Sequence, residues 1–117
     1  MNILIADDEK EYIDFMTERL TIRGHEVDAA YDGEKAMYLI KTNDYDIVFV
    51  DQNMTGWTGL ELAKYIKDNK VKTAVVMVTG YEGMEDFFAK AVGVDEYLTK
   101  PVKIKDVDDI VAKHDKR

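Results

Sequence analysis

The sequence predicts an open α/β fold, in which a doubly wound sheet of five mostly parallel strands has helices on both faces. Short apolar runs alternate with helical stripes in five strand–helix units that use nearly all 117 residues. Two runs, residues 47–50 and 74–78, are apolar throughout, which is typical of strands covered on both faces. This alternation favours a parallel sheet, and five units are too few for a closed eight-unit barrel.

The elements follow from these patterns in chain order. Each expected strand is a short apolar run bounded by polar residues or glycine, and the five cover residues 3–6, 27–30, 47–50, 74–78 and 96–99. Each expected helix carries apolar residues three or four positions apart, and the five cover residues 9–23, a segment from 32 through 40, a segment from 59 through 66, residues 84–92 and residues 103–113. Gly24 and Gly93 stand where helix C-caps are expected.

Composition excludes several classes of protein. The chain has 24 acidic and 16 basic residues, and its formal net charge of −8 argues against direct binding to nucleic acid or an anionic membrane. It has no cysteine, so disulfides and thiolate chemistry are excluded. No apolar run approaches the roughly 20 residues of a membrane span, and no secretory leader is evident. We expect one cytoplasmic domain over residues 1–117.

Side chains that can do chemistry stand at the ends of four expected strands. Asp7 and Asp8 follow the first strand, Asp51 follows the third, Thr79 ends the fourth and Lys100 follows the fifth. In open α/β sheets the site lies at the carboxyl ends of the strands, in a crevice where the winding reverses. If the first and third strands flank that reversal, three carboxylates converge on one crevice.

Converging carboxylates repel one another, and so they either rise in pKa or bind a cation. A set of oxygen ligands without cysteine suits Mg²⁺, which also binds phosphate oxygens. A carboxylate can itself attack phosphorus and form an aspartyl-phosphate, a reaction that needs positioning and neutralised charge. We expect Lys100 to supply positive charge and the Thr79 hydroxyl to donate to a phosphoryl oxygen. Backbone N–H groups at Gln52 and Gly80 would add donors.

Four segments resemble the receiver domains of two-component response regulators. They are the acidic opening at residues 3–9, the loop of residues 51–61, the Val78-Thr79-Gly80 segment and the Tyr97-Leu98-Thr99-Lys100-Pro101 segment. In this order they span essentially the whole chain. The resemblance implies a flavodoxin-like sheet with strand order 2-1-3-4-5 and five helices.

The resemblance also implies roles for single residues. Asp51 would be the phosphoacceptor. Asp8 and Asp51 would bind Mg²⁺ through their side chains, Asn53 through its backbone carbonyl and Asp7 mostly through water. The phosphoryl donor would be a phosphohistidine on a sensor histidine kinase or phosphotransfer protein.

Further implied roles concern switching. Lys100 would pair with the phosphoryl group, Thr79 would move toward it and Tyr97 would turn inward. The Lys100–Pro101 peptide bond would be cis. The face made by the fourth helix, fifth strand and fifth helix would then contact an output domain, a protein partner or a second copy of the chain. The resemblance implies a signalling switch and not an enzyme, with its own phosphorylation and dephosphorylation as its reactions.

Two positions depart from the family pattern or modify it. Thr55 stands where the family usually has proline, so we expect a looser loop. Gly80 directly follows Thr79, and without a side chain there we expect water to reach the phosphoryl group and its lifetime to be short.

Other functions and plainer interpretations remain open at this stage. A metal-dependent aspartyl-phosphate phosphatase shares most of these residues, but Asn53 stands where such enzymes place a second acid. A flavodoxin-like binding module or a receiver that does not accept phosphate would use the same fold. Residues 7–9 also suit a helix N-terminus, with Glu9 on the capping side. Trp57 is either a partner contact or a lid over the third helix.

Overall fold

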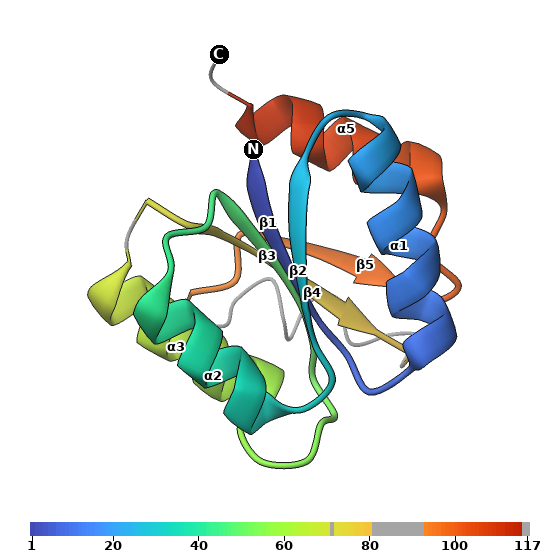
Figure 1. Ribbon diagram of the computed structural model, residues 1–117. Helices are drawn as coiled ribbons and strands as arrows, with labels where there is room; N and C mark the ends of the chain where they lie inside the picture. Colours follow the sequence, from blue (N-terminus) through green and yellow to red (C-terminus); the bar gives the residue numbers. More distant parts are fainter. Residues whose placement is uncertain (71, 81–92, 116–117) are drawn as a thin grey trace.

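The computed structural model describes residues 1–70, 72–80 and 93–115 (Figure 1). The strands in this part of the chain are β1 (Asn2–Ala6), β2 (Glu26–Ala30), β3 (Ile47–Asp51), β4 (Ala74–Thr79) and β5 (Glu96–Thr99). The helices are α1 (Lys10–Ile22), α2 (Gly33–Thr42), α3 (Gly59–Asn69) and α5 (Ile104–His114). The helix expected over residues 84–92 lies outside the described residues.

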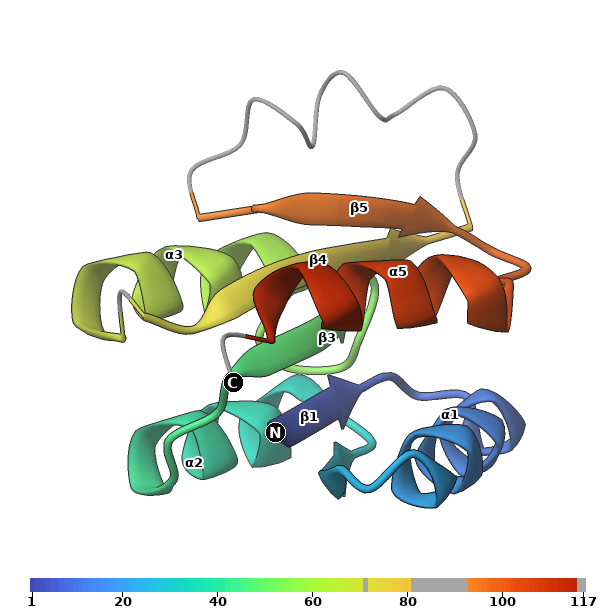
Figure 2. The same ribbon diagram turned by 90° about the horizontal axis from the view of Figure 1, so that it is seen from above.

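The strands form one parallel sheet in the order β2-β1-β3-β4-β5. Figure 2 shows β5, β4, β3 and β1 side by side, with the arrowheads of β1, β4 and β5 on the same side of the molecule. β1 lies between β2 and β3, so the winding reverses there, and β1 and β3 pair in register, with Ile5 opposite Phe49. The predicted fold class and the flavodoxin-like strand order are therefore confirmed.

Alternation along the strands divides the core into two layers. Ile3 and Ile5 of β1 face α1 and α5, whereas Leu4 and Ala6 face α2 and α3. Figure 1 shows the two helix pairs on opposite faces of the sheet. Because β3 is buried along its whole length, it has no polar residue until Asp51, where the strand reaches the open edge. This burial explains why the third strand was the easiest to predict.

The helix starts use different caps. Asp32 accepts a hydrogen bond from the backbone N–H of Lys35 at α2, and Thr58 forms a capping box with Glu61 at α3. Glu9 precedes α1 but makes no side-chain cap. Glu9 thus stands at the N-cap position, as expected for the helix N-terminus, but its carboxylate pairs with Lys100 and not with the helix backbone. In the described part of the chain, no helix is long and apolar enough to cross a membrane.

Candidate functional site

Three carboxylates meet at the carboxyl edge of the sheet. Asp7 and Asp8 follow β1, and Asp51 ends the neighbouring β3, so strand pairing places them together. One oxygen from each lies within 4.8 Å of the other two. Asp7 and Asp51 are buried and Asp8 is exposed. The acidic crevice expected from the sequence is thus a cluster that reaches solvent through Asp8, while Asp7 and Asp51 lie below the surface.

Lys100 brings a positive charge to these acids from the far side of the sheet. Its Nζ lies 2.9 Å from Asp7 Oδ2, 2.8 Å from Glu9 Oε1 and 3.9 Å from Asp51 Oδ2. The backbone N–H of Lys100 donates to the Thr79 carbonyl (2.8 Å), which ties the start of this loop to β4. The Lys100–Pro101 peptide bond is cis. Lys100 thus contacts Asp7 and Glu9 directly, and its ammonium is about 1 Å farther from Asp51.

The charges around Asp51 determine its protonation. Burial and the negative charge of Asp7 raise its pKa to about 6, although Lys100 and the backbone N–H of Asn53 oppose the rise. Burial lowers the pKa of Lys100, but its contacts with Asp7 and Glu9 raise it more, so its pKa lies above the ordinary value. Lys100 therefore remains a cation at neutral pH. Asp51 is mostly ionised at that pH, but burial and the charge of Asp7 make its ionised form less favourable than in water.

The loop after β3 is anchored at both ends. A Cβ on Gly59 would stand 2.7 Å from the Asp51 carbonyl oxygen, so only glycine allows α3 to begin this close to the acid. Gln52 Oε1 accepts from the backbone N–H of Leu60 (2.9 Å). The Thr55 carbonyl accepts from the backbone N–H of Gly33 (2.8 Å). The loop is thus tied to α2 despite the missing proline.

Trp57 has a structural role through its backbone. A Cβ at Gly33 would collide with the Trp57 backbone, so the loop and the start of α2 are in close contact. Trp57 is one of the exposed large hydrophobic residues of the described chain. Its role as a partner contact or lid stays undecided.

The expected switch residues lie at the ends of β4 and β5. Thr79 is buried and the following Gly80 is exposed, with open space where a Cβ would stand. The Tyr97 ring is 37% exposed, so it faces outward in this structure. Whether Thr79 moves and Tyr97 turns inward on phosphorylation stays a prediction.

Sequence reasoning missed two contacts of Lys100. Glu9 was treated as a capping residue, yet it pairs with Lys100 across 91 positions of sequence. The apolar spacing along α1 predicts a core position for Tyr12, yet the centroid of its ring lies 5.1 Å from Lys100 Nζ.

The donor set fits a hard divalent cation. The three acids offer carboxylate oxygens, which Mg²⁺ prefers, and they lie close enough to share one ion. Asp7 Oδ2 is buried and is paired with Lys100 Nζ at 2.9 Å, and the carboxylate has further lone pairs that can accept from a water on such an ion. Asn53 is exposed at the mouth of the same crevice, where its carbonyl stays a predicted ligand.

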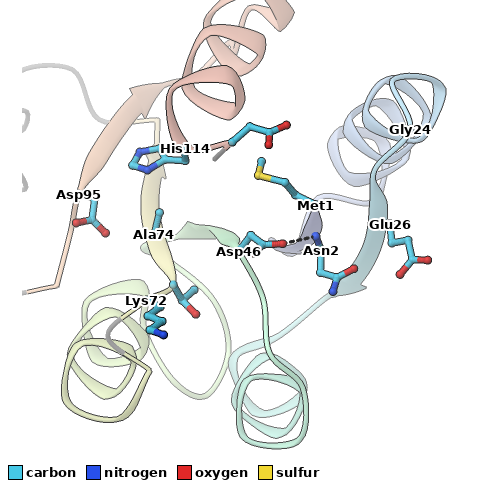
Figure 3. A pocket seen from close by; sticks show the side chains of 11 residues that line it. Met1, Asn2, Gly24, Glu26, Asp46, Lys72, Ala74, Asp95 and His114 are labelled. Carbon is cyan, nitrogen blue, oxygen red and sulfur yellow. Dashed lines mark hydrogen bonds between the residues drawn. The ribbon is translucent and has the colours of Figure 1, made fainter. Parts of the chain in front are cut away.

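A separate groove lies at the amino ends of the strands (Figure 3). It has a volume of about 1020 Å³ and is lined by residues that include Asn2, Asp46 and His114. Asp46 closes part of its floor by accepting from the backbone N–H of Asn2 (2.7 Å). None of the predicted site residues lines this groove, so it is separate from the acidic crevice.

Comparison with known proteins agrees with this geometry. The family model for the response regulator receiver domain matches residues 3–112. Transcriptional regulatory protein TcrA of Mycobacterium tuberculosis is 32% identical over 108 residues, which cover 92% of this chain and 43% of TcrA. Transcriptional regulatory protein TctD of Salmonella typhimurium is 29% identical over 109 residues, which cover 92% of this chain and 49% of TctD. The chain thus spans less than half the length of these curated relatives.

Solved structures give the same result. The receiver domain of the Francisella response regulator 1452 has a TM-score of 0.87 at 30% identity, with 97% of this chain and 94% of that chain covered. Response regulator TrrA of Thermotoga maritima, in complex with Mg²⁺ and BeF, has a TM-score of 0.87 at 30% identity, with 97% of each chain covered.

Proposed function

The chain belongs to the response regulator receiver domains of two-component signalling, and from this membership we propose that it is a phosphorylation switch whose acceptor is Asp51. The observation that carries the proposal is the crevice itself, in which a buried carboxylate stands beside two further acids and a lysine. We propose that residues 1–117 form one such domain, with Mg²⁺ as its cofactor. TrrA, which is similar over nearly its whole length, is described with Mg²⁺ and BeF bound.

In this proposal one residue carries out the nucleophilic attack and others hold the metal ion. A carboxylate oxygen of Asp51 attacks the phosphorus of a phosphohistidine, the P–N bond breaks, and the electron pair stays on the imidazole nitrogen, which takes up a proton. Asp7, Asp8, Asp51 and the Asn53 carbonyl would hold Mg²⁺, which when bound offsets the charge of the acids and of the phosphoryl oxygens.

The remaining groups would receive the phosphoryl oxygens. Lys100 moves from its present 3.9 Å separation from Asp51 Oδ2 into contact with the phosphoryl group. The backbone N–H groups of Gln52 and Gly80 and the Thr79 hydroxyl donate to its oxygens. The only bonds made and broken are those of phosphorylation and hydrolysis at Asp51, so the domain acts as a switch and not as an enzyme on a separate substrate.

The partners in this proposal are a sensor histidine kinase or phosphotransfer protein and an output module. TcrA and TctD are named transcriptional regulatory proteins and are more than twice as long as the matched segment, so an output module in the bacterial cytoplasm is part of the proposal. Of the surface expected to change, β5 and α5 are described, and Tyr97 is exposed on β5. Contact with an output domain or a second copy at this surface follows from the same proposal.

Labelling with a small phosphodonor tests the acceptor. We expect acetyl phosphate to add one phosphoryl group in the presence of Mg²⁺, as measured by intact-protein mass, and we expect Asp51→Asn to abolish the addition. Asp68→Asn is the matched control, because Asp68 is an exposed acid on α3 paired with Lys64. Labelling that persists in Asp51→Asn or proceeds in EDTA would contradict the assignment.

Gly80 sets a second expectation, about the lifetime of the phosphoryl group. Among the described residues, a Cβ at Gly80 meets nothing within 4 Å, so they leave room for a side chain to begin there. We expect Gly80→Val to lose the phosphoryl group more slowly than the parent, because the added methyl groups hinder approach of water. The decay of labelled protein after removal of the donor measures this, and a rate equal to the parent's would refute it.

A further inference from the structure

Tyr12 faces the acidic crevice from the first turn of α1. Its ring lies under the ammonium of Lys100, with 5.1 Å between Nζ and the ring centroid. Its hydroxyl is buried and has no hydrogen-bond partner within the part of the chain that the structure describes. Burial raises the pKa of this hydroxyl, and the charges of Asp7, Asp51 and Glu9 raise it further. Tyr12 therefore stays neutral and is surrounded by the groups of the site.

The carboxylates around Lys100 pull its ammonium in opposite directions. The Glu9 side chain is 62% exposed and lies 2.8 Å from Nζ, so it draws the ammonium toward solvent. Asp7 and Asp51 are buried and draw it inward, but Asp51 is still 3.9 Å away. A lysine side chain has several rotatable bonds, and holding it in one position loses conformational entropy. The ammonium contacts Asp7 and Glu9 at once, so an added attraction on the inner side shifts its position away from Glu9 and toward Asp51.

The ring of Tyr12 supplies that attraction. The face of an aromatic ring attracts a cation, and the attraction is larger where water is partly excluded. Lys100 is itself mostly buried, with 18% of its side chain exposed. A contact of this kind changes the population of the inner position by roughly three- to tenfold.

We propose that Tyr12 is a positioning residue for Lys100, whose ring holds the ammonium at the buried end of the crevice, against the pull of the exposed Glu9, so that it stands beside Asp51 when a phosphoryl group arrives. This inference rests on the proposed function, because the inner position matters only if Asp51 accepts phosphate. The ring and not the hydroxyl does the holding, so Tyr12→Phe retains the contact and Tyr12→Leu removes it.

The first measurement concerns Lys100 in protein that has not been phosphorylated. We expect the NMR signals of the Lys100 ε-methylene protons to carry a ring-current shift that Tyr12→Phe retains and Tyr12→Leu loses. If Tyr12→Leu does not fold, Tyr12→Met fills a similar volume without an aromatic face and replaces it. Lys100 signals that are the same with and without the ring would overturn the inference.

The second measurement is the rate of labelling by acetyl phosphate at saturating Mg²⁺. We expect Tyr12→Leu to be labelled roughly three- to tenfold more slowly than the parent, and Tyr12→Phe to recover the parent rate. Adding Glu9→Gln to Tyr12→Leu removes the outward pull and is expected to restore most of the rate. A purely structural role for Tyr12 would lower stability without this restoration, and that result would contradict the inference.

Tyr38 provides the matched control. It lies on α2, and Lys35 Nζ lies 5.3 Å from its ring centroid, so Tyr38→Leu removes a similar contact on an exposed surface. We expect that variant to be labelled at the parent rate. A parent protein that takes no phosphoryl group would overturn the proposed function, whereas the Lys100 signals would still decide whether the ring holds the ammonium.

Discussion

In metal-free buffer at pH 7.5, the Asp51→Asn variant is expected to unfold at a higher temperature than the parent. The pKa of Asp51 is about 6 in the folded chain, against an ordinary value of 3.8. Between these two values the folded chain holds a proton that the unfolded chain has lost, so stability falls as the pH rises through this interval. Above pH 6 the destabilisation is fully present, and below pH 4 it is absent. The amide avoids it at every pH.

The expected difference is about 3 kcal/mol at neutral pH. Thermal unfolding followed by circular dichroism measures it, and the gap between parent and variant should narrow as the pH is lowered from 7.5 to 4.5. Asp68→Asn controls for the loss of a negative charge in general, because its exposed partner Lys64 gives that pair little stability. A variant less stable than the parent at pH 7.5 would refute the repulsion inferred for the crevice.

Magnesium provides the converse test on the same two proteins. A cation that binds the folded chain alone stabilises it in proportion to the logarithm of its concentration above Kd. We therefore expect millimolar Mg²⁺ to raise the unfolding temperature of the parent and to raise that of Asp51→Asn much less, because one of three carboxylates is gone. Equal effects on both would place the bound ion outside the crevice.

The placement of these acids illustrates how far sequence reasoning reached. The apolar runs gave the strands to within about one residue, because β1, β3 and β4 are buried on both faces and tolerate no polar residue before the edge. The rule that sites lie at the carboxyl edge then brought Asp7, Asp51 and Lys100 together from distant positions. The first step depends only on whether a strand is covered on both faces, and the second only on which end of the strand a residue follows.

The contacts that were missed depend on side-chain directions. Tyr12 fits the apolar stripe of α1 by spacing, and that spacing does not show that its ring lies under Lys100. Glu9 has the position of a cap, but a lysine across the sheet competes for its carboxylate. These side-chain contacts emerge only when the packed elements fix the rotamers. The contact of Gly33 with the Trp57 backbone was missed for another reason, because it joins the start of α2 to the loop after β3, whose path no periodicity records.

Replacing Lys100 by methionine is expected to slow the labelling of Asp51 by at least about tenfold. The ammonium is the one protein cation beside the three acids in the part of the chain that the structure describes, and its loss leaves the charge of an incoming phosphoryl group less balanced. Lys100 also lowers the pKa of Asp51, so its removal should move the pH at which labelling is half-maximal to a higher value. Labelling rates between pH 5 and 9 at saturating Mg²⁺ report both effects.

A further variant, Lys100→Arg, separates the effect of charge from that of geometry. Lys100→Arg keeps a cation and should preserve the pH midpoint, but its planar fork cannot occupy the same point between Asp7 and Glu9, so its rate should stay below the parent's. Losing Lys100 also leaves the buried carboxylate of Asp7 unpaired, which destabilises the fold, so rates must be compared well below each unfolding temperature. Isothermal titration with Mg²⁺ shows whether the metal site survives. If Lys100→Met binds Mg²⁺ and is labelled with the parent's rate and pH midpoint, the ammonium has no part in the chemistry, and Tyr12 has nothing there to position.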